Sequence, residues 1–346
     1  MYLKDQNIEK QVSDWSMPAA YLKLFLQHAT AEGILVTPLL SGTGLEADKL
    51  LQSDQPVTFQ QTRKVLANAN RIMGPGWHLS LVSRLTVPSH GPLGFAVVTA
   101  PDLHSSVDVM LRYIGIRGPF LWLTSALEGE WFVIRLHETT DMGAERSAFV
   151  ELAILALQNL IERPLGREIQ AARIAFAHAA PPYQHQMASI FHPQLEFEAG
   201  RYSLRFPATW LQEPCVMYDE AMHRYLLLRC EEDLRSALGI LPAEVAVRQS
   251  LLAKPGMFPS LREIAAELHV SSRTLIRRLK QGQTSYNAIL EDVRRTLAVD
   301  YLLHTDMNIA RIAWRLGYQD PSNFGRAFRS WMGVSPGNYR SNRGKK

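Results

Sequence analysis

An apolar frame that occurs twice constrains this chain more than any other feature of its sequence. Its members are Leu261, Ile264, Ala265 and Leu268 in the first copy and, 48 residues later, Ile309, Ile312, Ala313 and Leu316 in the second. Apolar residues at positions i, i+3, i+4 and i+7 form one stripe of a short helix. The small alanine in each stripe lets a following helix cross closely over it. The repeat therefore predicts two pairs of crossing helices.

Each copy continues with a turn and a start signal for a second helix. The turn contains His269 in the first copy and Gly317 in the second. Glycine adopts positive φ without strain, and histidine does so less readily but more often than most residues. Ser271 or Ser272 can cap the second helix of the first copy, and Asp320 can cap that of the second. Together these parts predict a helix-turn-helix motif in each copy.

The outer faces of the two second helices are expected to be basic and polar. They carry Arg273, Arg277, Arg278 and Lys280 in the first copy and Ser322, Asn323, Arg326 and Arg329 in the second. Arginine matches guanine and phosphate, and asparagine can bond bidentately to adenine. A solvated basic face on an ordinary helix is the alternative. The same frame, cap and basic face in two copies favour DNA binding instead.

The spacer between the two motifs has a helical stripe that runs from Tyr286 to Leu302. A helix of about 20 residues is roughly 30 Å long. Successive major-groove faces of DNA lie about 34 Å apart. One rigid helix can therefore hold two reading helices one turn of DNA apart.

Charge is distributed unevenly along the chain, whose net charge is +4. Residues 240–346 hold 17 Lys and Arg against 8 Asp and Glu, a net charge of +9, whereas residues 1–239 carry −5. Basic charge is thus concentrated where phosphate neutralisation requires it. We expect DNA binding to be sensitive to salt.

The second copy and its closing segment match a known family at its spacing. They read Ile312-Ala313-x-x-Leu316-Gly317-Tyr318-x-Asp320-x-Ser322-x-Phe324-x-Arg326-x-Phe328-Arg329, then Gly333-x-Ser335-Pro336-x-x-Tyr339-Arg340. In this pattern, residues 241–340 resemble the DNA-binding domain of the AraC/XylS family of bacterial transcription regulators. The resemblance implies seven helices, with the second helix of each motif in the major groove of double-stranded promoter or operator DNA. It is also compatible with a homodimer and with contact to RNA polymerase.

The resemblance also implies which side chains meet DNA. Carried over by position, base contacts fall to Arg273, Ile276, Arg277, Ser322, Asn323 and Arg326, and backbone contacts to Thr274, Lys280 and Arg329. Two residues depart from the family pattern. His269 stands where glycine is common, and Ile276 stands where many relatives place a polar reader. Ile276 either touches a thymine methyl group or reads nothing.

The length of 346 residues suits two domains. We expect an α+β domain over residues 1–238 and an all-α DNA-binding domain over 239–346, with helix-turn-helix motifs at about 261–280 and 309–330 joined by a linker helix. In the first domain, the sequence predicts a β-hairpin around Leu127-Glu128-Gly129-Glu130, a helix over 103–113 and a helix over 144–162 that stops at Pro164. Residues 88–94 read as a turn-rich connection.

The first domain also resembles a known module over about residues 20–210. Gly91-Pro92-Leu93-Gly94-Phe95-Ala96, the helix after Pro101-Asp102-Leu103, and Arg112-Tyr113 are similar to the arabinose-binding-like N-terminal domain of regulators of the ornithine-utilisation type. The similarity implies a role in effector binding or dimerisation and names no ligand. Two hypotheses stay open: a sensor of a small-molecule effector, and a module that only dimerises or binds a protein partner.

No pattern in the chain indicates an enzyme, a cofactor or a metal site. Cys215 and Cys230 are the only cysteines, and the histidines form no H-x-x-x-H or H-E-x-x-H pair. His185 and His192, seven residues apart on one expected helix, come closest to a cluster. A DNA-repair methyltransferase, which needs a dedicated set of cysteines, is thereby disfavoured. The chain has no signal-peptide pattern and no run of 18 uncharged apolar residues, so we expect it in the cytoplasm, away from the membrane.

Overall fold

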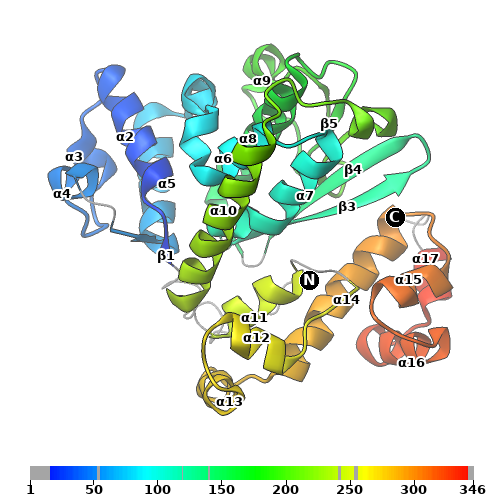
Figure 1. Ribbon diagram of the computed structural model, residues 1–346. Coiled ribbons are helices and arrows are strands. Elements are labelled where there is room, and N and C mark those ends of the chain that lie inside the picture. The colour runs from blue at the N-terminus through cyan, green and yellow to red at the C-terminus, as the bar shows by residue number, and fades with distance from the viewer. Residues whose placement is uncertain are drawn as a thin grey trace. The chain divides into compact units, whose positions relative to one another are not determined.

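The computed structural model describes residues 16–52, 55–118, 120–138, 141–240, 243–252 and 256–341. The chain divides into two compact units, Met1–Leu234 and Arg235–Lys346 (Figure 1). The first unit is α+β and the second is all-helical. The division falls within one helix, α10 (Glu220–Ile240).

The first unit is built on a five-stranded sheet with the strand order β3-β4-β7-β5-β6. The strands are β3 (Leu121–Glu128), β4 (Trp131–Glu138), β5 (Arg173–Ala175), β6 (Gln194–Glu196) and β7 (Tyr202–Pro207). β3 and β4 pair in antiparallel register from Leu121↔Glu138 to Glu128↔Trp131. Gly129, at φ 58°, makes the turn between them. The predicted hairpin is therefore confirmed.

Helices surround this sheet. They are α2 (Ala20–Ala31), α3 (Val36–Leu39), α4 (Ala47–Gln52), α5 (Phe59–Met73), α6 (Pro92–Val98), α7 (Leu103–Tyr113), α8 (Arg146–Leu165) and α9 (Gln184–Ile190), with a 3₁₀ helix, η1 (Trp77–Arg84). α7 packs against β3, and α8 packs against β7. A short pair of strands, β1 (Ser16–Met17) and β2 (Val57–Thr58), precedes α2 and α5. Thr58 and Gln61 form a capping box at the start of α5.

Two sequence predictions for this unit are wrong. The helix expected to stop at Pro164 runs through it, and Gly166, at φ 65°, ends it instead. The helix extends only one residue beyond Pro164, to Leu165, and close to a helix C-terminus the disruption by a proline affects little helix. The connection expected at 88–94 is half helical, because α6 begins at Pro92. Proline suits that first helical position, which needs no N–H partner.

The second unit contains seven helices within its described residues, as the resemblance implied. They are α11 (Ala243–Leu252), α12 (Leu261–Glu267), α13 (Ser272–Gln281), α14 (Tyr286–His304), α15 (Ile309–Arg315), α16 (Pro321–Met332) and α17 (Pro336–Ser341). α14 supplies the centre of the core, where Val293, Leu297 and Leu302 are almost completely buried. α12 packs on α13 and α15 packs on α16.

Candidate functional site

The two turns between paired helices have the same hydrogen bonds. After α12, Val270 N donates to Ala265 O (2.9 Å) and His269 N donates to Ala266 O (3.1 Å). After α15, Tyr318 N donates to Ala313 O (3.0 Å) and Gly317 N donates to Trp314 O (3.0 Å). This is the Schellman arrangement, which requires a left-handed residue just beyond the helix.

The left-handed residues are the two that the sequence singled out. His269 has φ 53° and Gly317 has φ 73°. A left-handed conformation brings the Cβ of a non-glycine residue close to the following carbonyl oxygen. His269 therefore holds a strained conformation that Gly317 adopts freely. Both first helices therefore end in the same kind of turn.

The second helix of each motif buries two large apolar residues one turn apart. These are Leu275 and Leu279 on α13, and Phe324 and Phe328 on α16, all at most 2% exposed. The paired positions are 49 residues apart, whereas the first helices are offset by 48. The turn of the second motif is therefore one residue longer. In this register Arg273 corresponds to Ser322 and Arg277 to Arg326.

The side chains opposite these buried pairs face solvent. The residues predicted to contact DNA are exposed at Arg273, Ile276, Arg277, Lys280, Ser322, Asn323, Arg326 and Arg329, and half-buried at Thr274. With successive residues about 100° apart around a helix, Arg277 and Arg326 point directly away from the core. Arg326 Nη2 donates to Asn323 Oδ1 (2.6 Å), so the two side chains of α16 form one polar unit.

Side-chain caps begin both second helices. Thr274 N donates to Ser271 Oγ (3.1 Å) at the start of α13, and Ser322 N donates to Asp320 Oδ1 (2.8 Å) at the start of α16. Of the two serines that the sequence offers as caps, Ser271 and Ser272, the structure has Ser271 as the cap. The hydrogen bond from Ser322 lowers the pKa of the Asp320 carboxyl. Asp320 thus supports the orientation of α16 in its charged form.

Arg294, on the linker helix α14, contacts the turn of the second motif and the segment just before the first motif. Its guanidinium lies 4.7 Å from the ring centroid of Tyr318, in the second turn, and 5.4 Å from that of Phe258, just before α12. Such cation–π contacts stabilise a fixed arrangement of the three groups. The linker helix therefore braces the two motifs against each other by side chains as well as by its length.

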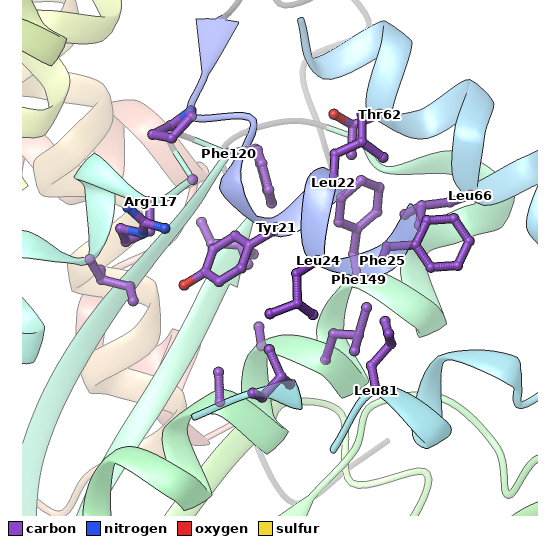
Figure 2. A pocket seen from close by; sticks show the side chains of 18 of the residues that line it. Tyr21, Leu22, Leu24, Phe25, Thr62, Leu66, Leu81, Arg117, Phe120 and Phe149 are labelled. Carbon is purple, nitrogen blue, oxygen red and sulfur yellow. The ribbon is translucent and has the colours of Figure 1, made fainter. Parts of the chain in front are cut away.

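The first unit contains a partly open apolar cavity of about 150 Å³ between its N-terminal helices, α8 and the β3–β4 hairpin (Figure 2). Most lining side chains are aliphatic or aromatic, among them Phe25, Leu66, Trp77, Phe149 and Leu157. A molecule that fills it would stabilise the unit.

Profile comparison matches residues 33–215 to the family described as the arabinose-binding domain of AraC transcription regulators, N-terminal, and residues 264–342 to a helix-turn-helix domain. The first match alone covers more than half of the chain. This chain belongs to the AraC family of transcription regulators.

Relatives of this AraC-family chain span almost its whole length. The ornithine utilization regulator of Pseudomonas aeruginosa is 31% identical over 329 residues, which is 94% of this chain and 96% of the relative. An uncharacterized HTH-type transcriptional regulator of Mycobacterium tuberculosis is 26% identical over 337 residues, covering 93% and 95%. The crystal structure of transcriptional regulator CdpR from Pseudomonas aeruginosa has 18% identity and a TM-score of 0.46, covering 93% of this chain and 98% of its own.

The family assignment makes the chain a regulator and not an enzyme, and its two thiols agree with that. Cys215 and Cys230 are both buried and free. Burial raises the pKa of the Cys230 thiol to about 12 and also raises that of Cys215. Both thiols therefore stay protonated and unreactive at neutral pH. In the part of the chain that the structure describes, no helix is long and apolar enough to cross a membrane.

Sequence reasoning missed a buried polar cluster around Glu151 on α8. His78 Nε2 lies 2.7 Å from Glu151 Oε2, and His178 Nε2 lies 3.2 Å from Glu151 Oε1. Tyr183 donates its hydroxyl proton to the same Oε1 (3.2 Å). These residues are distant in the sequence, so no local spacing announces them. The described residues contain no group of three or more His, Cys, Asp or Glu side chains able to hold a metal ion.

The other residues that had suggested a site are dispersed. His192 lies beyond the end of α9 and close to Glu162, so it shares no helix with His185. Among the large aromatic residues of the first unit, Trp77 lines the cavity, whereas Phe95 is 41% exposed. Trp122 and Phe132 are buried without lining it.

Proposed function

We propose that this AraC-family regulator inserts α13 and α16 into two successive major grooves of its operator, and that its N-terminal unit binds a small-molecule effector that changes DNA binding. The observation that carries the first part is the repeated build of the two helices. Each buries an apolar pair and exposes an arginine on the opposite face, at Arg277 and Arg326. Two helices of the same construction support two equivalent reading heads.

Equivalent positions of α13 and α16 are 49 residues apart, and comparing them shows which DNA contacts the two heads would share. Arg277 and Arg326 correspond, and so do Lys280 and Arg329, which gives both heads a central arginine and a second cation one turn along. The central arginines suit guanine edges, and the second cations suit phosphate oxygens. The heads differ at the first of these positions, where α13 has Arg273 and α16 has Ser322. Differences of this kind would let each head prefer its own sequence.

The linker helix supports simultaneous binding by both heads. α14 has 19 residues, which is about 28 Å of helix. One turn of DNA is about 34 Å, so the remaining distance is within the reach of the helices that flank α14. Neither head then has to bend the DNA strongly before the other binds. A regulator of this kind acts in the bacterial cytoplasm, where the chromosome and RNA polymerase are present.

The effector role rests on the apolar cavity in the unit that matches the arabinose-binding domain. The alternative is that this unit only dimerises or binds a protein partner. A row of exposed apolar side chains at and before the start of α10 favours a homodimer as an additional property: Val216, Met217, Tyr218, Met222, Tyr225 and Leu228. Several exposed large apolar side chains within one segment are typical of an interaction site.

The test is fluorescence anisotropy of DNA from upstream of the protein's own gene, with a scrambled duplex as control, over a series of salt concentrations. The full-length protein and residues 240–346 are compared. Preference for the natural DNA by both proteins supports the two reading heads. Preference by the full-length protein alone assigns dimerisation to the first unit. Equal binding of both duplexes by both proteins would refute sequence-specific regulation.

A further inference from the structure

The cavity of the N-terminal unit is apolar except at one side, where it carries a positive charge. Among the described residues that line it, Arg117 is the only one with a formal charge. Figure 2 shows Arg117 beside Tyr21, with Phe25 and Leu66 on the other side of the pocket in this view. A ligand that fills the space therefore meets hydrocarbon over most of its surface and one guanidinium at its end.

The charge of Arg117 is not neutralised by the part of the protein that the structure describes. Arg117 Nη2 donates to the backbone oxygen of Ser89 (3.1 Å), and its guanidinium lies 4.8 Å from the ring centroid of Tyr21. Its buried Nε has no hydrogen-bond partner, and no described carboxylate forms an ion pair with it. A guanidinium has five N–H donors in a planar fork. The structure describes a hydrogen-bond partner for one of these donors, at Nη2.

The neighbouring Tyr21 and His90 carry no charge that would compete for a bound anion. Tyr21 Oη lies 2.8 Å from His90 Nδ1, so the Tyr21 hydroxyl is already hydrogen-bonded, whereas the buried His90 Nε2 has no described partner. His90 is 1% exposed, and burial together with the charge of Arg117 lowers the pKa of its imidazole to about 4. His90 is therefore neutral at pH 7. The positive charge beside the cavity is that of Arg117 alone.

We propose that the cavity binds a small monocarboxylic acid with an apolar alkyl or aryl body, whose carboxylate pairs with Arg117. The proposal rests on the effector role given above and names the class of effector. A planar guanidinium and a carboxylate form two parallel hydrogen bonds, and a partly desolvated site strengthens them. A cavity of about 150 Å³ lined by apolar side chains accepts a body the size of benzene. Phenylacetate and octanoate are suitable probes.

The lining argues against a cationic amino acid. One relative carries the name ornithine utilization regulator. Ornithine has two amino groups that need acceptors, and the described lining contains no aspartate or glutamate. Burying an unpaired ammonium group costs more than the apolar contacts would return. The cavity of this chain therefore suits a ligand of a different chemical class.

Isothermal titration calorimetry on the full-length protein, without DNA, tests the proposal. The probes are octanoate, octanol and octylamine, which share one alkyl body, with phenylacetate against phenylethanol as a second pair and ornithine as a further comparison. At pH 7 we expect each acid to bind roughly tenfold tighter than its alcohol, because only the acid forms charge-assisted hydrogen bonds. Octylamine and ornithine should bind more weakly still.

Variants locate the binding site. Arg117→Gln should abolish the preference for acid over alcohol while the alcohol still binds. Arg167→Gln is the matched control, because Arg167 also lies over an aromatic ring, 4.9 Å from the centroid of Trp210, but lines no part of the cavity. Ala156→Phe should fill the cavity and abolish binding of acid and alcohol alike, and Ala153→Leu gives a milder filling if the first variant does not fold.

Equal affinity for acid and alcohol in the wild-type protein, an unchanged preference in Arg117→Gln, or no binding of any acid would overturn the proposal. Anisotropy on promoter DNA with and without octanoate keeps the two proposals apart. If octanoate binds as described and promoter affinity does not change, the ligand class stands and the effector role fails. If promoter affinity responds only to compounds outside the class and no acid binds, the effector role stands and the ligand class fails.

Discussion

At the scale of single residues, Arg326 and Arg329 on α16 should affect DNA binding in different ways. Arg326 points directly away from the buried Phe324 and Phe328, whereas Arg329 lies toward the side of the helix. We predict that Arg326→Ala weakens operator binding by about 1–3 kcal/mol and relaxes the preference at its own base pair. Arg329→Ala should weaken binding to all sequences alike.

Anisotropy with operators substituted at each position distinguishes these two effects. The bracing of Arg326 by Asn323 implies that Asn323→Ala should reproduce part of the Arg326 defect, because the guanidinium loses its fixed orientation. A uniform loss in Arg326→Ala would make Arg326 a phosphate contact. No loss at all would reject its place in the interface.

At the scale of elements, the two turns make opposite predictions for stability. His269→Gly should stabilise the second unit by about 1 kcal/mol, because glycine adopts the left-handed conformation without strain. Gly317→Ala should destabilise it by about 1–2 kcal/mol. A Cβ there would combine φ 73° with contacts of 3.2 Å to Arg294 Nη2 and 3.4 Å to Phe258.

Urea unfolding of the second unit measures both changes. Gly325→Ala is the matched control, since that glycine lies within α16 with open space around it. Alanine there should stabilise the helix by about 1 kcal/mol. The account of the turns is wrong if His269→Gly destabilises the unit or if Gly317→Ala behaves like the control.

The cap of α16 should make the stability of the second unit depend on pH. The folded-state pKa of Asp320 is lowered, chiefly by the backbone hydrogen bond from Ser322. A lowered pKa means that the stabilisation is complete above the unfolded value of about 3.9 and is lost as pH falls through the folded value. Asparagine caps a helix without titrating, so Asp320→Asn provides the reference.

Thermal melts between pH 2 and 7 check this. The Tm difference between the wild-type protein and Asp320→Asn should be constant above about pH 5. Below about pH 4 the Tm of the wild-type protein should fall relative to that of the variant. A difference that does not change over this range would mean that the Asp320 charge contributes nothing.

The elements also explain which parts of the molecule could be predicted. The motifs of the second unit were predictable because each stripe, cap and turn lies within a short segment, as in Ser271 to Leu279. The cluster at Glu151 was not, since His78 is 73 residues away and meets it only through tertiary packing. The end of α8 departs from the local rule for proline, because the helix continues through Pro164 to Leu165 before Gly166 ends it. The sequence around Arg117 does not indicate a binding residue, because only the fold brings Arg117 beside an apolar cavity.

At the scale of the whole molecule, the excess of basic residues after position 240 predicts salt-sensitive DNA binding. The slope of log K against log salt should be about −0.9 for each neutralised phosphate. If Lys280 and Arg329 each contact one phosphate, replacing both with alanine should reduce the slope by about 1.8. Lys49→Ala changes the net charge outside the interface and should leave the slope unchanged. An unaltered slope in the double variant would remove both residues from the backbone contacts.

The claim that two helices of one chain read two successive major grooves is tested most directly by hydroxyl-radical footprinting. The full-length protein is bound to DNA from upstream of its own gene. We predict protected windows in pairs about 10 base pairs apart on one face of the DNA. Arg277→Ala should weaken one window of each pair, and Arg326→Ala should weaken the other. A single window for each bound protein, or the loss of the same window in both variants, would contradict the account.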